Sequence, residues 1–147
     1  MIFYLDGTGQ HGLIAATNNQ SSSATWGCYG TALSGADGTA TGTGLQNTND
    51  IINGCYETGI AAKICSDLSL GGYNDWYLPS KDESYLIFQN RNAIGGFSTE
   101  WCYYWTSSEA GAYNAWSIRF PDGFQNSGSA TGTYKSDNNS VRCIRSF

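Results

Sequence analysis

The feature that most constrains the fold is a helix start near the middle of the chain, at Pro79-Ser80-Lys81-Asp82-Glu83. Ser80 and Glu83 match the S-x-x-E capping box, in which each side chain accepts a hydrogen bond from the other residue's backbone N–H. The aromatic and aliphatic residues that follow supply an apolar face. We therefore predict a helix over residues 81–91 that begins at this box.

A first helix is expected earlier in the chain, beginning at Asn49 with Thr48 or Asn47 as its cap. Apolar residues at helical spacing over 60–68 give this helix a buried face. Two internal glycines can interrupt it, and Gly71-Gly72 is expected to end it.

Strands are expected at both ends of the chain. Residues 2–5 and 12–16 flank a glycine-containing turn, which is typical of a β-hairpin. After the second helix, residues 103–107, 115–120 and 140–145 are aromatic or β-branched with partial alternation, which predicts antiparallel strands. Two helices and a late antiparallel sheet give an α+β fold.

The chain length of 147 residues predicts a single domain over residues 1–147. With 19 glycines, and with Ser, Thr and Asn abundant, long Gly/Ser/Asn-rich loops are expected, above all over residues 21–49, which we interpret as a long ordered loop. A mobile surface loop is the alternative there.

Charge and cysteine usage narrow the classes of partner and compartment. The net charge of −5, without a cluster of Lys and Arg, argues against a nucleic-acid partner. No run approaches the roughly 18 apolar residues of a membrane-spanning helix, so membrane insertion is not expected. Five cysteines, none in a C-x-x-C pair, favour disulfides and an oxidising compartment over a zinc site.

Several spaced motifs resemble one bacterial family. The segments that carry the resemblance are residues 11–16, 26–28, 44–48, 71–83, 104–109, 115–116 and 141–145. In this order they are similar to the C-terminal domain family of the Legionella collagen-like adhesin, and they cover nearly the whole chain. Three tryptophans fall inside these motifs and are expected to fill the core: Trp76, Trp105 and Trp116.

The resemblance implies a C-type-lectin-like fold, with two helices packed on an antiparallel sheet, at a secreted or bacterial cell-surface location. It also implies a homotrimer that binds a polysaccharide such as a sulfated glycosaminoglycan. The chain has no Gly-X-Y stalk of its own. The Leu-Pro-Ser-x-x-Glu element is also similar to that of formylglycine-generating enzymes, but shared fold does not carry activity, and no reactive cysteine pair is recognisable.

The cysteine pairing has two candidate solutions. We favour a bridge from Cys28 to Cys55, which would hold the long loop on the first helix, and one from Cys102 to Cys143, at the edges of two predicted strands. Cys65 would then be a small buried hydrophobe. The rival is a bridge from Cys65 to Cys143, which joins helix to last strand as in lectin-like folds.

Lectin-like folds expose their recognition surface in loops after the second helix, and aromatic rings, amides and charges there suit a sugar. The predicted ligand-binding residues are Tyr113, Asn114, Arg119, Phe124, Gln125, Asn126, Tyr134, Lys135 and Asn138. Ordinary solvated turns are the alternative interpretation.

Four of the seven cations fall in the last 29 residues, at Arg119, Lys135, Arg142 and Arg145, against two acidic residues. The local charge of +2, which becomes +6 in a trimer with converging faces, would attract a polyanion at low salt. Arg142 and Arg145 could equally be ion-pair partners for Asp75 or Glu109.

No cofactor is required by these patterns, although calcium could find oxygen ligands in residues 122–126 and 137–139, and Asn74-Asp75 is similar to part of a lectin calcium motif. The single histidine, His11, lies in the predicted hairpin without a nucleophile motif, so catalysis is not expected.

The sequence therefore favours an extracellular recognition domain that binds glycans with avidity from trimerisation. The second hypothesis is a protein-binding tip domain of a bacterial or phage surface fibre. The third is a hydrolase or modifying enzyme in a lectin-like shell.

Overall fold

The computed structural model describes residues 1–128 and 130–147, which form a mixed α+β fold with two sheets and four helices. The smaller sheet has the order β1-β2-β8, and the larger one the order β3-β7-β4-β5-β6. The strands of the smaller sheet are β1 (Ile2–Leu5), β2 (Gly12–Ala15) and β8 (Ile144–Ser146). Those of the larger sheet are β3 (Ser21–Ala24), β4 (Cys102–Glu109), β5 (Ala115–Phe120), β6 (Gln125–Asn126) and β7 (Asn139–Val141).

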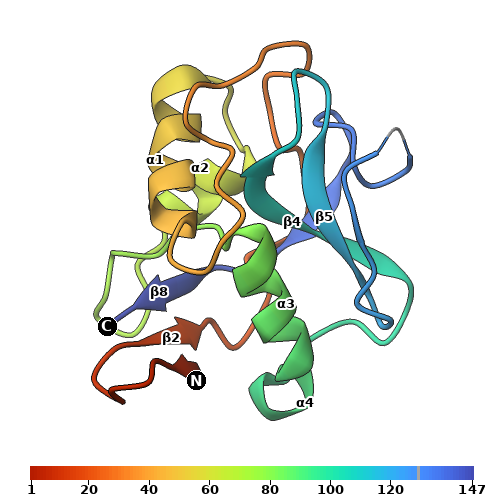
Figure 1. The fold of residues 1–147 in the computed structure, drawn as a ribbon. Coiled ribbons are helices and arrows are strands. Elements are labelled where there is room, and N and C mark those ends of the chain that lie inside the picture. The colour runs from red at the N-terminus through yellow and green to blue at the C-terminus, as the bar shows by residue number, and fades with distance from the viewer. Residues whose placement is uncertain (129) are drawn as a thin grey trace.

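The helices fill the space beside the two sheets (Figure 1). They are α1 (Gly44–Gly54), α2 (Ala61–Ser66), α3 (Lys81–Gln89) and the short α4 (Arg91–Ile94). Helices α1 and α2 pack on each other, whereas α3 contacts β4 and β5 of the larger sheet and β1 of the smaller one. No helix in the described part of the chain is long and apolar enough to span a membrane.

The predicted capping box starts α3. The Ser80 side chain accepts a hydrogen bond from the Glu83 N–H, and the Glu83 carboxylate accepts one from the Ser80 N–H at 2.7 Å. The helix predicted over 81–91 is confirmed in type and start. It ends at Gln89, and α4 follows directly.

The predicted first helix was wrong in its start and its length. Helix α1 begins at Gly44, five residues before Asn49, and the chain becomes extended at Cys55, so α2 is a separate helix. Thr48 and Asn47 do not cap it. Both are buried. The Thr48 hydroxyl hydrogen-bonds to the backbone of Leu78, and the Asn47 side-chain amide hydrogen-bonds to the backbone of Gly38.

The larger sheet differs from the predicted antiparallel meander. The hairpin of β1 and β2 and the pairing of β4 with β5 are antiparallel as expected. However, β7 pairs in parallel with β4, and the strand expected over 140–145 is divided into β7 and β8, which belong to different sheets. Strand β3, which pairs with β7, lies inside the segment predicted as a loop.

Two disulfides tie the helices to the rest of the fold. The Cys28–Cys55 bridge is confirmed, whereas Cys143 pairs with Cys65 rather than with Cys102. The register explains this correction: Tyr104 lies opposite Ser140 in parallel strands, so Cys102 and Cys143 are five residues out of step, or roughly 16 Å along the sheet. The predicted rival pairing, from helix to last strand, is the one present.

The main core lies between α1, α2 and the larger sheet. Trp26 and Trp105 are fully buried there, and their indole N–H groups donate to the carbonyls of Thr106 and Ala24. Trp76 is also buried, as predicted, but Trp116 is only half-buried, with the Lys81 ammonium 4.9 Å above its ring.

Candidate functional site

The nine predicted ligand-binding residues do not form one site. Tyr113 and Asn114 lie at the turn between β4 and β5, where Asn114 forms a bridge with Tyr134. Arg119, near the end of β5, and Phe124, in the turn after β5, lie at the other end of the same hairpin (Figure 1). The hairpin therefore separates two groups of candidate side chains.

Lys135 was wrongly predicted to be a ligand contact, because its side chain is fully buried. Its ammonium lies 2.5 Å from a Glu109 carboxylate oxygen and 2.8 Å from the Thr31 carbonyl, over the Trp26 ring. Burial lowers the pKa of Lys135, and the hydrogen bond to Glu109 opposes that shift. This ammonium holds the long loop in place and is inaccessible to a glycan.

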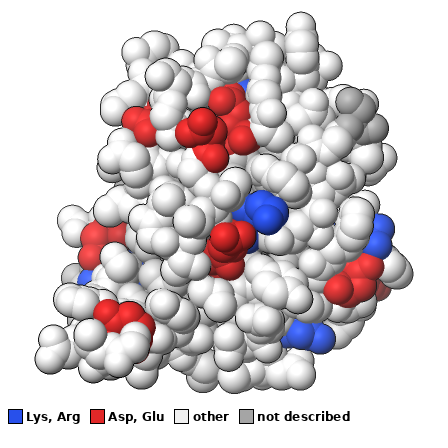
Figure 2. All heavy atoms as spheres, viewed as in Figure 1, with Lys and Arg blue, Asp and Glu red and all other residues white. Residues whose placement is uncertain are grey.

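The predicted basic face does not form among the described residues. Arg142 is buried and donates to Asn19 and to the carbonyls of Gly95 and Gly96, and burial lowers its pKa to about 10. Arg145 pairs with Asp75 at 2.6 Å, which confirms the alternative ion-pair interpretation for Arg145, whereas Arg142 pairs with neither Asp75 nor Glu109. Figure 2 shows separate positive residues beside negative ones on the visible face, without a broad positive patch.

Most of the predicted amides are engaged within the fold. The Gln125 side chain donates to the Lys81 carbonyl, at 2.6 Å, and to Ser84 on α3. Asn114 donates to Gly128, and Asn126 accepts from the Gly128 N–H. These contacts fix the loops and leave the amides poorly placed for a ligand.

An exposed stacked cluster, which we call the aromatic platform, is formed by Trp101, Arg119 and Phe124. The Arg119 guanidinium lies 4.4 Å from the centre of the Trp101 ring and 5.0 Å from that of Phe124. The exposed fractions are 66% for Trp101 and 52% for Phe124. Two large rings thus remain in solvent around a planar cation that their faces attract, and their apolar surface is open to a ligand that would bury it.

Asp122 holds the centre of the platform. Its two oxygens accept from Arg119 Nε at 3.1 Å and from a terminal nitrogen at 2.5 Å, and one of them also accepts from the Phe124 N–H. The pairing raises the pKa of Arg119 and lowers that of Asp122. The guanidinium plane is therefore fixed before any ligand arrives.

Local sequence explains how these side chains meet. The turn after β5 closes with hydrogen bonds from Gly123 N–H to Arg119 and from Arg119 N–H to Phe124, which return Phe124 beside Arg119. Gly123 has φ of 75°, and a side chain there would collide with Phe88 of α3. Trp101 joins them because Cys102, the next residue, pairs with Phe120 across the hairpin.

Trp101 was missed by the sequence analysis. It lies outside the family motifs and just before a strand, at the end of a polar Ser-Thr-Glu stretch. That context was the available signal, since a tryptophan in a polar segment has no local apolar partners.

A second aromatic pair lies at the opposite end of the hairpin. The rings of Tyr29 and Tyr113 meet edge to face with centres 5.0 Å apart, and each side chain is about half exposed. Lys135 lies buried beneath this end, where its backbone N–H donates a hydrogen bond to the Tyr113 carbonyl.

The carboxylates considered for calcium are occupied by protein groups. Asp122 binds Arg119, and Asp137 accepts from the N–H groups of Gly132 and Tyr134. In the described residues, the one cluster with metal-ligand spacing is Cys28, Cys55 and Glu57, whose two sulfurs form a disulfide. Asn138 is exposed, and its side chain makes no hydrogen bond within the described part of the chain.

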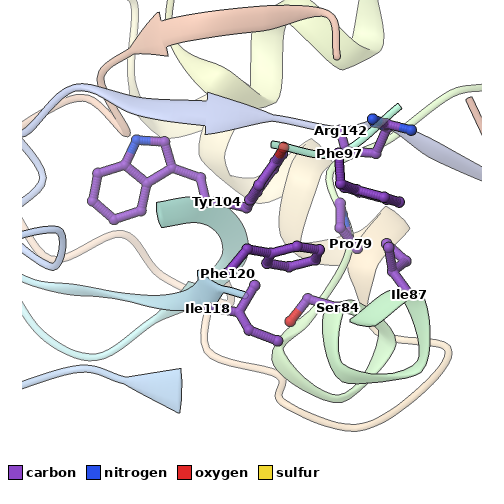
Figure 3. A pocket seen from close by; sticks show the side chains of 9 residues that line it. Pro79, Ser84, Ile87, Phe97, Tyr104, Ile118, Phe120 and Arg142 are labelled. Atoms are coloured by element: carbon purple, nitrogen blue, oxygen red, sulfur yellow. The ribbon is translucent and has the colours of Figure 1, made fainter. Parts of the chain in front are cut away.

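A buried hollow lies between α3 and the larger sheet, lined by aromatic rings such as Phe97, Tyr104 and Phe120 together with Arg142 (Figure 3). It measures about 10 Å³, close to the space for one water molecule. Such a hollow is too small for a substrate. The exposed platform, with two uncovered rings around a fixed cation, is the better candidate for recognition.

Comparison with known proteins gives one result that bears on this site. The family described as Lcl C-terminal domain matches residues 14–145, which is nearly the whole chain and includes the platform. No curated protein matches the chain. The match confirms the resemblance inferred from the spaced motifs, and the chain therefore belongs to the Lcl C-terminal domain family.

Proposed function

We propose that this chain is an adhesin-type surface recognition domain that binds a glycan on the aromatic platform. The observation that carries the proposal is the Arg119 guanidinium, held by Asp122 between two exposed rings. The apolar face of a sugar ring packs on aromatic rings of this kind. The free edges of Arg119 and Asp122 would then meet the sugar hydroxyls.

The charge distribution favours a glycan with few charges over a densely sulfated chain. The net charge is −5, and Lys135, Arg142 and Arg145 are buried or paired. Polyanion binding requires several converging cations, and these three are engaged inside the fold. We therefore infer that ring stacking supplies most of the affinity.

We further propose a C-type-lectin-like fold, a secreted or cell-surface location and a homotrimer. The bridge from α2 to the last strands, through Cys65 and Cys143, supports the lectin-like fold. Two disulfides suit an oxidising compartment. Because the platform is shallow, each site would bind weakly, and a trimer would supply useful avidity.

Substitution of the platform rings tests this function. Trp101→Ala and Phe124→Ala should each weaken glycan binding by roughly 10-fold, the effect of about 1.4 kcal/mol of lost stacking. Tyr56→Ala is the matched control, since Tyr56 is an exposed aromatic residue between α1 and α2. Binding on a glycan array that is equal in all four proteins would refute the platform as the site.

A protein-binding tip domain is the second candidate, and the Tyr29–Tyr113 pair favours it. Exposed tyrosines are frequent anchors of protein interfaces. This function predicts that Tyr113→Ala abolishes binding to a target surface, that Trp101→Ala does not, and that soluble saccharides fail to compete.

A further inference from the structure

We propose that the groove beside the platform binds a carboxylate through Arg91, so that the preferred ligand is a glycan bearing an acidic sugar of the uronic-acid type. This inference rests on the proposed function and names the ligand class of the same surface. Three features of the structure support it. The groove is large enough for a sugar unit, Arg91 has no carboxylate partner in the described part of the chain, and the groove adjoins the platform.

The groove is bounded by α4, the segment after it, and the end of β5. It measures about 430 Å³, enough for a monosaccharide unit. Its polar side chains are Arg91, Asn92, Ser98 and Thr99. Phe97 and Phe120, labelled in Figure 3, line both the buried hollow and this groove, so the groove has a rigid aromatic base.

Arg91 differs from the other cations. Five of the seven lie within 4 Å of a carboxylate, and Arg142 is buried among backbone carbonyls. Within the described residues, Arg91 is the one cation that is neither buried nor paired with a carboxylate. A cation that lines a groove and has no carboxylate partner in the protein attracts an anion from solution.

The Arg91 side chain is also held in a fixed position. Its guanidinium lies 4.1 Å from the centre of the Phe88 ring, and one terminal nitrogen donates to the Phe88 carbonyl at 2.9 Å. Its other N–H groups make no hydrogen bond within the described residues. Because a guanidinium presents its donors as a planar fork, it can bind a carboxylate through two parallel hydrogen bonds.

The groove and the platform are neighbours along two segments of the chain. Thr99 of the groove precedes Trp101 by two residues, and Pro121 of the groove is next to Asp122. The same two segments lie side by side, since Cys102 pairs with Phe120. A sugar stacked on the platform would therefore place an adjoining acidic sugar over the groove.

The test compares matched neutral and acidic sugars. Methyl β-glycosides of glucose and galactose, and of their uronic acids, are titrated at fixed ionic strength and followed by NMR. The wild-type protein should bind the uronides roughly 10-fold more tightly than the neutral glycosides, as one charge-assisted pair predicts. A 6-sulfated glucoside tests the other anion, and binding tighter than the uronide would contradict a carboxylate site.

Two variants isolate the charge. Arg91→Met keeps an apolar stem on Phe88 and should abolish the preference for uronides while neutral binding persists. Lys63→Met removes one positive charge from a surface residue that is already paired with Asp67, and should leave the preference intact. An unchanged preference in Arg91→Met would overturn the Arg91 site alone. Absence of binding to every sugar would overturn the proposed function as well.

Discussion

Lys135 and Glu109 illustrate what a single buried pair does in this fold. Their side chains are 0% and 7% exposed, and the ammonium also binds the Thr31 carbonyl. Lys135→Ala would leave the Glu109 carboxylate buried without its partner. We expect the free energy of unfolding to fall by about 3 to 5 kcal/mol, measured by urea denaturation.

A double variant serves as the control. Replacement of both partners, as Lys135→Met with Glu109→Leu, should recover most of the lost stability, because no uncompensated charge remains. If Lys135→Ala instead kept full stability and lost glycan binding, Lys135 would be a ligand contact after all.

The same residue shows where sequence reasoning stops. Lys135 lies in a polar Thr-Tyr-Lys-Ser-Asp stretch, which is typical of a solvated loop. Its burial depends on Glu109, Trp26 and Thr31, which are distant in sequence. Arg119 and Phe124 could be predicted because they are close together in the chain, whereas Trp101 reaches them only through strand pairing.

At the scale of elements, Glu83 joins the start of α3 to the loop before α1. Its buried carboxylate accepts from the N–H groups of Ser80 and Gly42. Glu83→Ala leaves both donors without an acceptor, and should lower the free energy of unfolding by about 1 to 3 kcal/mol relative to Glu83→Gln. Thermal or urea unfolding of the two variants measures this difference.

The pH dependence of this contact has a definite sign. Burial raises the pKa of Glu83 above its ordinary value, against the N–H donors that lower it. The stability contributed by this group is therefore fully present below the unfolded pKa and is lost as the pH rises through the folded pKa. Wild-type stability relative to Glu83→Gln should fall over that rise, and an increase would show that the carboxylate is held in its charged form.

The Cys65–Cys143 bridge ties α2 to the segment between β7 and β8, across 78 residues of chain. Replacement of both cysteines by alanine should cost about 2 to 5 kcal/mol of stability. Cys102→Ala, at a half-buried free thiol, should cost less than about 1 kcal/mol. Peptide mapping without reduction checks the pairing, and a fragment that links Cys102 to Cys143 would contradict it.

Elements were predictable where their signals are local. The capping box contains all its partners within four residues, and α3 starts where it predicts. The start of α1 depends on a residue that is distant in sequence. Gly44 packs so closely on Glu83 that a side chain there would collide with the carboxylate. Likewise, the division of residues 140–145 into two strands depends on which sheet each half joins.

At the scale of the whole molecule, the platform lies away from the ends of the chain. Both termini are at the smaller sheet, where the backbones of Gly12 and Phe147 hydrogen-bond. Figure 1 shows the turn after β5 on the other side of the view.

The most direct test is the indole region of an amide NMR spectrum during a glycan titration. The chain has five tryptophans, and the indole N–H groups of Trp26, Trp76 and Trp105 donate to backbone carbonyls. We predict that the Trp101 indole signal shifts progressively with added glycan while those three stay fixed. A saturable glycan interaction that leaves the Trp101 signal unmoved would contradict binding at the aromatic platform.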